Sequence, residues 1–388
     1  MRILLFSDSL YPEFVGGIER RNADLAAALG RRGHAVTLAG FGRSDGPSAA
    51  GVRVLSLGGN RPLYSAAGSR AARPAIGLAR AAWRIPLGDY DAVETSNVPF
   101  VHLFPLAARC ASAGKPLLVS WYEYWGSYWN SYAGFRAPFY RAVERVSAQI
   151  GDVVASSALT AGRLARRLRR DVPVVSCGTD VDDIAAAVAG VEEEPGRVIY
   201  AGRLLAHKRV DLLLDAVAAI PVARLVVYGE GPERESLLRR ACGLGITARV
   251  EFRAPSPDRA ELWREIGKSA VAAQPSSREG FGIFPLEALA AGVPVVYVRS
   301  EHSAVEEVVR HGIEGVRTEP DAAALARAIA GLLDDGPARR SMGARGRARA
   351  GEYRADRSAA AVEEVFERLL GRRRVRGGAE PGRRDSAA

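Results

Sequence analysis

Short apolar runs alternate with helix-like stretches along most of the chain, and this alternation occurs twice. In the first half, the apolar run 3–6 precedes a helical pattern over 19–29, and the run 92–95 precedes a helical pattern over 101–111. After an acidic Pro-Gly stretch at 192–196, read as an exposed connector, the pattern begins again. Its apolar runs are 198–201, 225–228, 250–252, 270–273 and 295–298. Strands that alternate with helices are typical of parallel sheets covered on both faces, so the sequence predicts two α/β units in tandem.

Length and composition agree with a globular protein of two domains. A chain of 388 residues is longer than a typical single domain with one hydrophobic core. Its composition, with 48% hydrophobic and 25% charged residues, is typical of globular chains. No apolar run approaches the roughly 18 residues of a membrane span, and the start lacks the pattern of a secretory signal. The three cysteines, Cys110, Cys177 and Cys242, are too far apart to indicate a disulfide framework or a zinc site. We therefore expect a cytoplasmic protein with reduced cysteines.

The formal net charge of +10 favours partners that carry phosphate, such as nucleotides or anionic membrane surfaces. Only three of the basic residues are lysines, so the charge also fits a general bias toward arginine. Arginine clusters at 163–170 and 372–376 would suit an anionic membrane at the inner face of the cell, although a solvated surface is the commoner explanation of such clusters. Because the basic residues are dispersed and no recognised motif accompanies them, we do not expect a nucleic-acid partner.

The stretch 274–296 is the most informative part of the sequence for function. A strand leads into a turn that carries glycines, and a helix is predicted to begin near Ile283. The N–H groups at a helix start have no intrahelical acceptor and commonly hold phosphate. Glu279 lies in the turn and Glu287 lies one helical turn inside, where the two carboxylates could accept hydrogen bonds from sugar hydroxyls. A structural glycine turn with two unrelated glutamates remains the alternative.

The same stretch resembles the signature of the family 4 glycosyltransferases of the GT-B fold. The shared frame is Pro-Ser, Glu-Gly-Phe-Gly, Glu-Ala and Ala-Gly-x-Pro-Val-Val, with seven residues between the two glutamates. The resemblance implies two Rossmann-like domains facing across a cleft. It assigns the transferred sugar to Glu279 and the nucleotide ribose to Glu287. Donor phosphates would lie near the N–H groups of Gly282 and Ile283, with Gly280 and Phe281 in the same donor-binding loop.

A second motif, Gly202-Arg203-Leu204 followed by Lys208, resembles the pair of cations that this family places beside the donor diphosphate. Departure of the nucleotide builds negative charge on phosphate, and fixed cations stabilise that charge. Arg203 and Lys208 would then replace a divalent metal, so no metal and no cofactor besides the nucleotide sugar is expected. An ordinary surface charge remains the alternative for Arg203.

Further donor contacts are implied by the resemblance alone. Gly16 and Gly17 match a glycine-rich loop whose backbone approaches the donor, since a residue without Cβ permits close approach. Gly229 lies in a loop near the nucleotide, and Arg253 lies where the family packs the base. His34 also fits the family, as a structural residue. None of these positions identifies the base or the sugar.

The acceptor side departs from the family pattern. Tyr122, before Glu123, stands where the family usually has a histidine that approaches the sugar, and these two residues are the acceptor-side candidates. Ten aromatic residues gather in 121–140, which suits stacking on a sugar and equally suits a packed core. Asp180 and Asp182 have the spacing of a metal-binding pair, but Asp180 is expected to cap the next helix. The sequence contains neither a phosphate-binding P-loop nor a dinucleotide fingerprint.

Together these features predict an acceptor-binding domain over 1–180 and a donor-binding domain over 181–355. The helix 356–370 is expected to pack back on the first domain, and 371–388 to form a disordered basic tail. The predicted function is retaining transfer of a hexose from a nucleotide diphosphate sugar to a glycan, a lipid-linked acceptor or a small molecule. A nucleotide-sugar 2-epimerase-like isomerase and a non-catalytic nucleotide-sugar-binding subunit are the alternatives.

Overall fold

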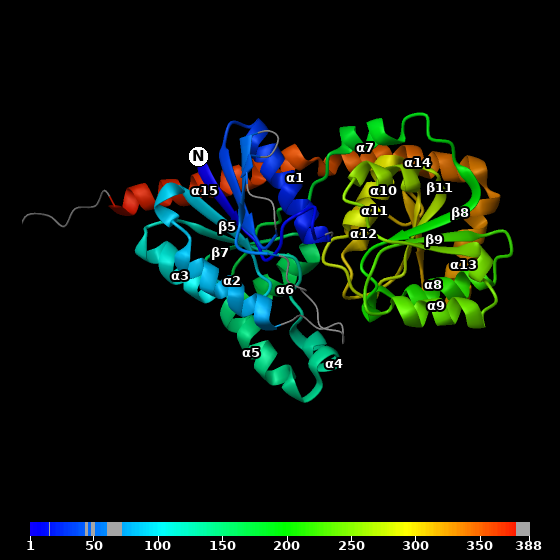
Figure 1. The fold of residues 1–388 in the computed structure, drawn as a ribbon, viewed down its shortest axis with the longest axis horizontal. Coiled ribbons are helices and arrows are strands. Elements are labelled where there is room, and N and C mark those ends of the chain that lie inside the picture. The colour runs from blue at the N-terminus through cyan, green and yellow to red at the C-terminus, as the bar shows by residue number, and fades with distance from the viewer. Residues whose placement is uncertain (15, 43–45, 48–50, 60–71, 378–388) are drawn as a thin grey trace, which may run out of the picture.

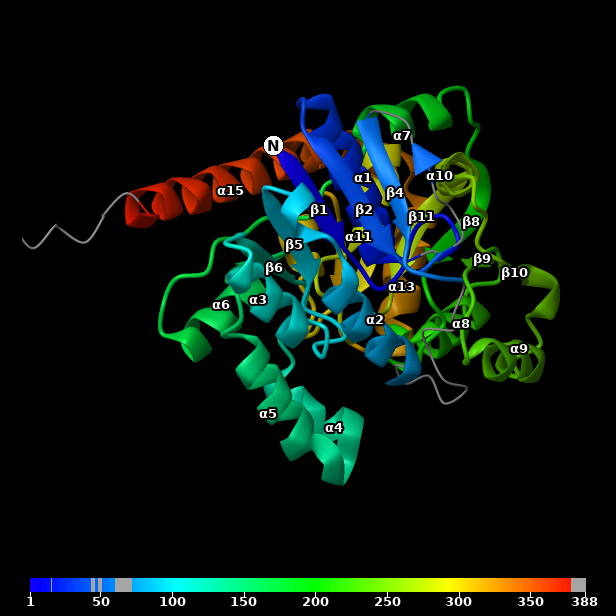
Figure 2. The ribbon, with the colours of Figure 1, turned by 60° about the vertical axis from the view of Figure 1, so that its left-hand side comes forward.

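The computed structural model describes the whole chain except residues 15, 43–45, 48–50, 60–71 and 378–388 (Figure 1). It consists of two α/β domains placed side by side, each with a central sheet between layers of helices (Figures 1 and 2). Both sheets have buried strands, as expected when helices cover both faces. The predicted α/β class is confirmed.

The N-terminal domain contains a seven-stranded sheet in the order β3-β4-β2-β1-β5-β6-β7. Among its described strands, only the short edge strand β3 pairs antiparallel. The strands are β1 (Arg2–Phe6), β2 (Ala35–Gly40), β3 (Gly46–Pro47), β4 (Val52–Ser56), β5 (Ala92–Ser96), β6 (Leu117–Trp121) and β7 (Asp152–Ala155). The helices are α1 (Gly17–Arg31), α2 (Ala72–Arg84), α3 (Leu103–Ser112), α4 (Trp129–Ala133), α5 (Ala137–Ser147) and α6 (Ala158–Leu168).

The C-terminal domain contains a six-stranded parallel sheet in the order β10-β9-β8-β11-β12-β13. Its strands are β8 (Glu194–Ala201), β9 (Arg224–Tyr228), β10 (Val250–Arg253), β11 (Ser269–Gln274), β12 (Val295–Val298) and β13 (Gly315–Thr318). Its helices are α7 (Val181–Val188), α8 (Val210–Ala218), α9 (Arg234–Gly243), α10 (Arg259–Gly267), α11 (Ile283–Ala291), α12 (Val305–Val308), α13 (Ala322–Asp334) and α14 (Gly336–Ala350). The stretch 192–196, interpreted above as a connector, is in part the beginning of β8, because Glu194 already bonds to Lys268 beside β11.

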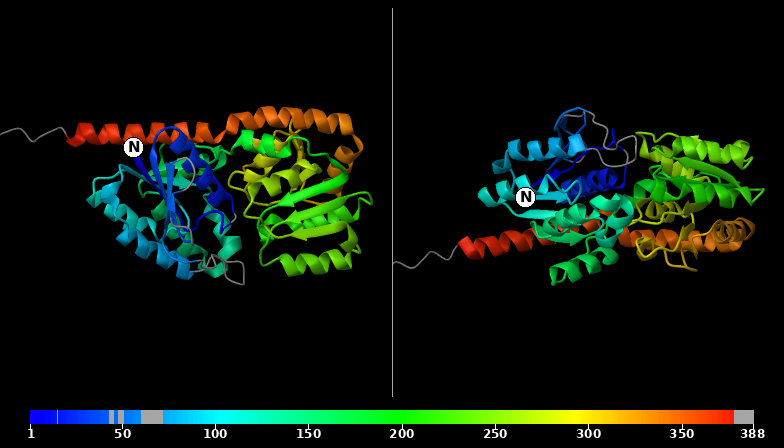
Figure 3. Two further views of the ribbon diagram at one scale, coloured as in Figure 1. Left: turned by 45° about the horizontal axis from the view of Figure 1, so that its top comes forward. Right: turned by 90° about the horizontal axis from the view of Figure 1, so that it is seen from below.

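Helix α15 (Ala355–Gly377) follows α14 and returns to the N-terminal domain (Figure 3). Phe366 is fully buried and packs in one apolar cluster with Leu5 and Leu25. Glu363 holds His34 at 2.9 Å, so this histidine links α15 to the first domain. The helix runs to residue 377, which corrects the predicted disorder from 371, since the arginines that follow Gly371 favour a helix. The remainder, 378–388, lies outside the described residues.

Among the described residues, no helix combines the length and the apolar character needed to span a bilayer.

Candidate functional site

The predicted site residues follow strands at the carboxyl ends of both sheets. β1 is followed by the loop with Gly16 and Gly17, β8 by Arg203, and β11 by the turn that carries Glu279. In parallel sheets, ligands commonly bind at the carboxyl ends of the strands. Loops that are distant in sequence therefore meet at the boundary between the two domains.

Glu279 and Lys208 contact each other directly. Lys208 ends a short 3₁₀ turn after β8, and its Nζ lies 2.6 Å from Glu279 Oε1. The amide of Gln274 donates to the same oxygen. Both charged side chains are mostly shielded from solvent, with 12% of the Glu279 side chain and 18% of the Lys208 side chain exposed. The sequence did not single out Gln274, whose only signal is its place at the end of the strand that leads to Glu279.

Arg203 extends across the domain boundary to the first turn of α1. Its Nη2 lies 2.9 Å from Glu19 Oε1, and Glu19 is buried and accepts a 2.7 Å hydrogen bond from Ser9. A Cβ on Gly16 would overlap both the Arg203 guanidinium and the Glu19 carboxylate, so a larger residue here would have to displace the ends of these two side chains. Sequence reasoning missed Glu19, although an acidic residue just after a Gly-Gly turn was a visible signal.

Glu287 is completely buried and is held from both domains. Arg20 donates to it across the boundary at 2.9 Å and 3.2 Å, and the Trp263 indole donates at 3.1 Å. Asp24, one turn further along α1, pairs with Arg259 of the C-terminal domain. The first two turns of α1 thus place charged groups against the C-terminal domain.

Helix α11 begins at Ile283 as predicted, and Gly282 before it has φ of +111°, a conformation that favours glycine. Among the described residues, no side chain caps the start of α11. Its first N–H groups are therefore suited to an anionic ligand. Ile283 lies against Gly17, where an added Cβ would sit 3.3 Å from Cδ1. Gly280 lies beside the N-terminal domain, since its carbonyl accepts a 3.4 Å hydrogen bond from Ser156.

Two predicted donor residues have side chains engaged elsewhere. Phe281 is buried in the core of its domain, with its ring 5.6 Å from Tyr353. The Arg253 guanidinium pairs with Glu251 and Glu265, at 2.6 Å and 2.7 Å. The backbone carbonyl of Arg253 accepts from the N–H of Gly229, another predicted residue, at 2.8 Å. In the part of the chain that the structure describes, the Arg253 side chain forms its ion pairs with the two glutamates and not with the other predicted residues.

The two acceptor-side candidates differ in environment. Within the described part of the chain, the Tyr122 hydroxyl has no hydrogen-bond partner, and burial raises its pKa despite the Arg21 guanidinium 5.9 Å from the ring. This phenol therefore stays protonated. Glu123 instead faces the C-terminal domain, with its carboxylate 3.1 Å from the guanidinium of Arg278.

The aromatic segment serves as both core and surface. Trp121 and Trp129 are buried, whereas Phe135 and Phe139 are 89% and 67% exposed. The buried tryptophans belong to a packed core beneath the domain boundary, and the two exposed phenylalanines form an apolar surface.

His207 precedes Lys208 and contributes no charge to the site. Burial, reinforced by Arg278 and Lys208, lowers its pKa to about 2. It is therefore neutral across the physiological range, and the positive charge near Glu279 comes from lysine and arginine.

No group of three or more His, Cys, Asp or Glu side chains among the described residues is arranged to hold a metal ion. Asp180 caps α7 by accepting from the N–H of Asp183, as predicted.

Two family models match consecutive parts of the chain. The model described as Glycosyltransferase Family 4 matches residues 15–183, and the model described as Glycosyl transferases group 1 matches residues 182–349. Together they cover both domains.

Curated relatives match over part of their length. A D-inositol 3-phosphate glycosyltransferase of Mycobacterium sp. (strain KMS) is 35% identical over 181 residues, which is 43% of this chain and 40% of that protein. The lipopolysaccharide core biosynthesis glycosyltransferase LpsE of Rhizobium meliloti (strain 1021) is 31% identical over 182 residues, which is 46% of this chain and 52% of that protein. The matches thus span about half the length of these relatives or less.

Solved structures resemble almost the whole chain. Sucrose-phosphate synthase from Thermosynechococcus elongatus has a TM-score of 0.79 at 20% identity, over 96% of this chain and 100% of that chain. Anabaena HepE in complex with UDP-glucose has a TM-score of 0.73 at 21% identity, over 95% of this chain and 100% of that chain. These likenesses confirm the predicted GT-B fold.

Proposed function

Because the chain belongs to the family 4 glycosyltransferases, we propose that it transfers a hexose from a nucleotide diphosphate sugar to an acceptor hydroxyl, with retention of anomeric configuration. The observation that carries this proposal is the contact of Lys208 with Glu279 at 2.6 Å beside the uncapped start of α11. A cation, a carboxylate and free N–H groups are what a sugar diphosphate requires.

We propose that different residues of the site bind different parts of the donor. Glu279 would hold hydroxyls of the sugar, Glu287 the ribose, and the N–H groups of Gly282 and Ile283 the phosphates. Glu287 is now paired with Arg20, so a bound ribose would share or replace that contact. The crossing of Arg203 to Glu19 brings a second cation toward the same boundary.

The proposed chemistry is front-side displacement. The bond from the anomeric carbon to the phosphate oxygen breaks while the acceptor oxygen forms a bond to the same carbon from the same face. The acceptor proton passes to the departing phosphate. Lys208 and Arg203 would stabilise the charge that develops on that phosphate, and we propose that no divalent metal is needed.

A thermal-shift panel of nucleotide diphosphate sugars tests the donor, because a ligand of the native state raises the melting temperature according to its affinity. We expect one nucleotide sugar to give the largest shift, with and without EDTA. Incubation with that donor and candidate acceptors, followed by NMR of the product, should show transfer with retained configuration. Conversion of the donor without acceptor would instead indicate an isomerase, and tight binding without any conversion would indicate a binding subunit.

We further propose that the protein acts in the cytoplasm, in glycan synthesis, and that it docks on anionic membrane.

The proposed docking surface lies on helices α4 and α5, which project from the N-terminal domain (Figure 2). Along α5 and just before it, Phe135, Phe139 and Val146 are exposed, while Arg136 and Arg145 are exposed beside them. Apolar side chains with flanking arginines suit the interface of an anionic bilayer. Arg163 in α6, which belongs to the arginine cluster 163–170, faces inward, toward His302. The tail positions 373–376 lie outside the residues whose side chains are described.

Replacing Phe135 and Phe139 together with serine should weaken binding to vesicles that contain acidic lipid by at least roughly tenfold, because two aromatic side chains leave the interface. Co-sedimentation with acidic and with neutral vesicles measures this. Val222→Ser is the matched control, since Val222 is 65% exposed on the other domain. Equal sedimentation of both variants would contradict membrane docking through α5.

A further inference from the structure

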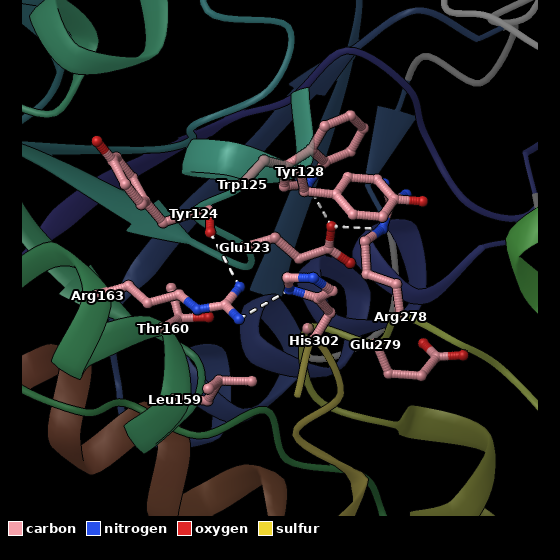
Figure 4. Close-up of a pocket in the computed structure, with 11 residues that line it drawn as sticks. Glu123, Tyr124, Trp125, Tyr128, Leu159, Thr160, Arg163, Arg278, Glu279 and His302 are labelled. Carbon is pink, nitrogen blue, oxygen red and sulfur yellow. Dashed lines mark hydrogen bonds and ion pairs between the residues drawn. The ribbon is translucent and has the colours of Figure 1, made fainter. Parts of the chain in front are cut away.

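A small pocket lies between the domains, directly beside Glu279 (Figure 4). The N-terminal domain contributes Trp125, Tyr128 and Arg163, and the C-terminal domain contributes Arg278 and His302. Its hollow measures about 10 Å³, which is room for a single water. Glu279, the proposed sugar contact, lines the same pocket, so whatever binds there lies beside the transferred sugar.

Arg278 is buried and its hydrogen-bonding capacity is not filled. It is only 8% exposed, and Nη1 has no hydrogen-bond partner among the described residues. Its guanidinium stacks 3.9 Å from the centre of the Trp125 ring and 4.8 Å from that of Tyr128. Stacking occupies the faces of the guanidinium and leaves its edge for an oxygen anion.

Arg163 is the second cation of the pocket, and its contacts are all neutral. It donates to the carbonyl of Tyr124 at 3.3 Å, to the carbonyl of Glu301 at 2.7 Å and to the His302 ring at 2.9 Å. Across the described ranges of the chain, no carboxylate forms an ion pair with Arg163. Burial, more than any other cause, lowers its pKa, as expected for a guanidinium without a counter-ion.

The His302 ring adds a neutral hydrogen-bonding group to the pocket, next to Arg163. Burial, followed by the neighbouring Arg163, lowers its pKa. Its ring also faces the exposed carboxylate of Glu301 at 3.3 Å and the ring of Tyr128 at 5.2 Å.

The carboxylate of Glu123 is the one that pairs with a guanidinium of the pocket. It lies 3.1 Å from Arg278 and accepts from the Trp125 indole, and Figure 4 shows it between Arg278 and His302. The other carboxylate of the pocket, Glu279, is already neutralised by Lys208. The pocket therefore carries two guanidinium charges against one available carboxylate, and Glu123 occupies the place of an oxygen anion.

We propose that this pocket is an acceptor subsite for an anionic oxygen group, a phosphate or a carboxylate, which displaces Glu123 from Arg278 and is held by Arg278 and Arg163. The inference rests on the proposed function in that it makes the ligand an acceptor. It specifies that the acceptor is a negatively charged sugar or sugar-like molecule. Because the present hollow has room for only about one water, the Glu123 side chain has to move aside for the anion to enter.

Binding of three probes tests the subsite: a hexose phosphate, a hexuronate and the neutral hexose, each titrated by calorimetry into the protein alone and again in the presence of the nucleotide that gives the largest thermal shift. Arg163→Gln and Arg278→Gln should each weaken binding of the charged probe by roughly 10- to 100-fold, the range for a lost charge-assisted contact. Glu123→Gln should tighten it, because the competing carboxylate is removed. Arg166→Gln, at an exposed position of the same helix, is the matched control and should bind like the wild type.

Tighter binding of the charged probe to Glu123→Gln, together with weaker binding to the arginine variants, would not arise from a general loss of structure. Preference for the phosphate or for the carboxylate identifies which anion the subsite takes. The proposal is overturned if the neutral hexose binds as tightly as both charged probes, or if both arginine variants bind normally. Displacement of the charged probe by the nucleotide would also overturn it, by placing the anion at the donor phosphates. Since the readout is binding, failure of the donor panel would count against the transferase proposal alone.

Discussion

Replacing Lys208 with methionine should lower the turnover number by roughly 10²- to 10³-fold, the range observed when one fixed electrostatic contact to a developing anion is removed. The ammonium lies 2.6 Å from Glu279 and is largely shielded from water, so bulk solvent cannot replace it. Donor affinity should fall much less, because the lost interaction strengthens as the phosphate departs. Steady-state kinetics and calorimetry with the donor separate the two effects.

Lys268→Met is the matched control for this variant. Lys268 also pairs with a carboxylate, that of Glu265 at 2.8 Å, so the substitution removes the same chemical groups away from the site. It should leave turnover unchanged. Lys208→Arg, which keeps the charge, should recover part of the activity. Full activity in Lys208→Met would show that the lysine does not serve the leaving group.

Replacing Glu279 with alanine should reduce turnover by roughly 100-fold or more while changing nucleotide binding far less. The carboxylate is expected to position the sugar, and small errors in position are costly at a reacting centre. Glu279 also orients Lys208 through their direct contact. Glu279→Gln keeps the shape but loses the charge, so it should retain the fold and lose most of the activity. Turnover and donor affinity measured side by side give the result.

Glu306→Ala is the control, because Glu306 pairs with Arg317 at 3.0 Å on the surface of the same domain. Unchanged turnover in Glu279→Ala would remove this residue from the mechanism. The double variant of Glu279 and Lys208 should lose less than the product of the single losses, since residues in contact act as a unit.

The sequence by itself determined the fold class and the local structure of the stretch that carries Glu279 and Glu287. Alternating strand and helix patterns identify an α/β chain because the two periods are properties of each segment alone. The strand, turn and helix around Glu279 are likewise local, so the start of α11 at Ile283 and the placement of Glu287 inside it could be predicted. The capping of α7 by Asp180 could be predicted for the same reason.

Only the tertiary structure decided which charges meet. Arg203 pairs with Glu19 across 184 positions of sequence, and Arg20 pairs with Glu287 across 267. Local patterns contain no information on such partners, because they depend on how two domains pack. For the same reason the meeting of Arg163 with His302 could be found only when the two domains were seen together. The turn of Arg253 toward Glu265 depends instead on how β10 and α10 pack within the C-terminal domain.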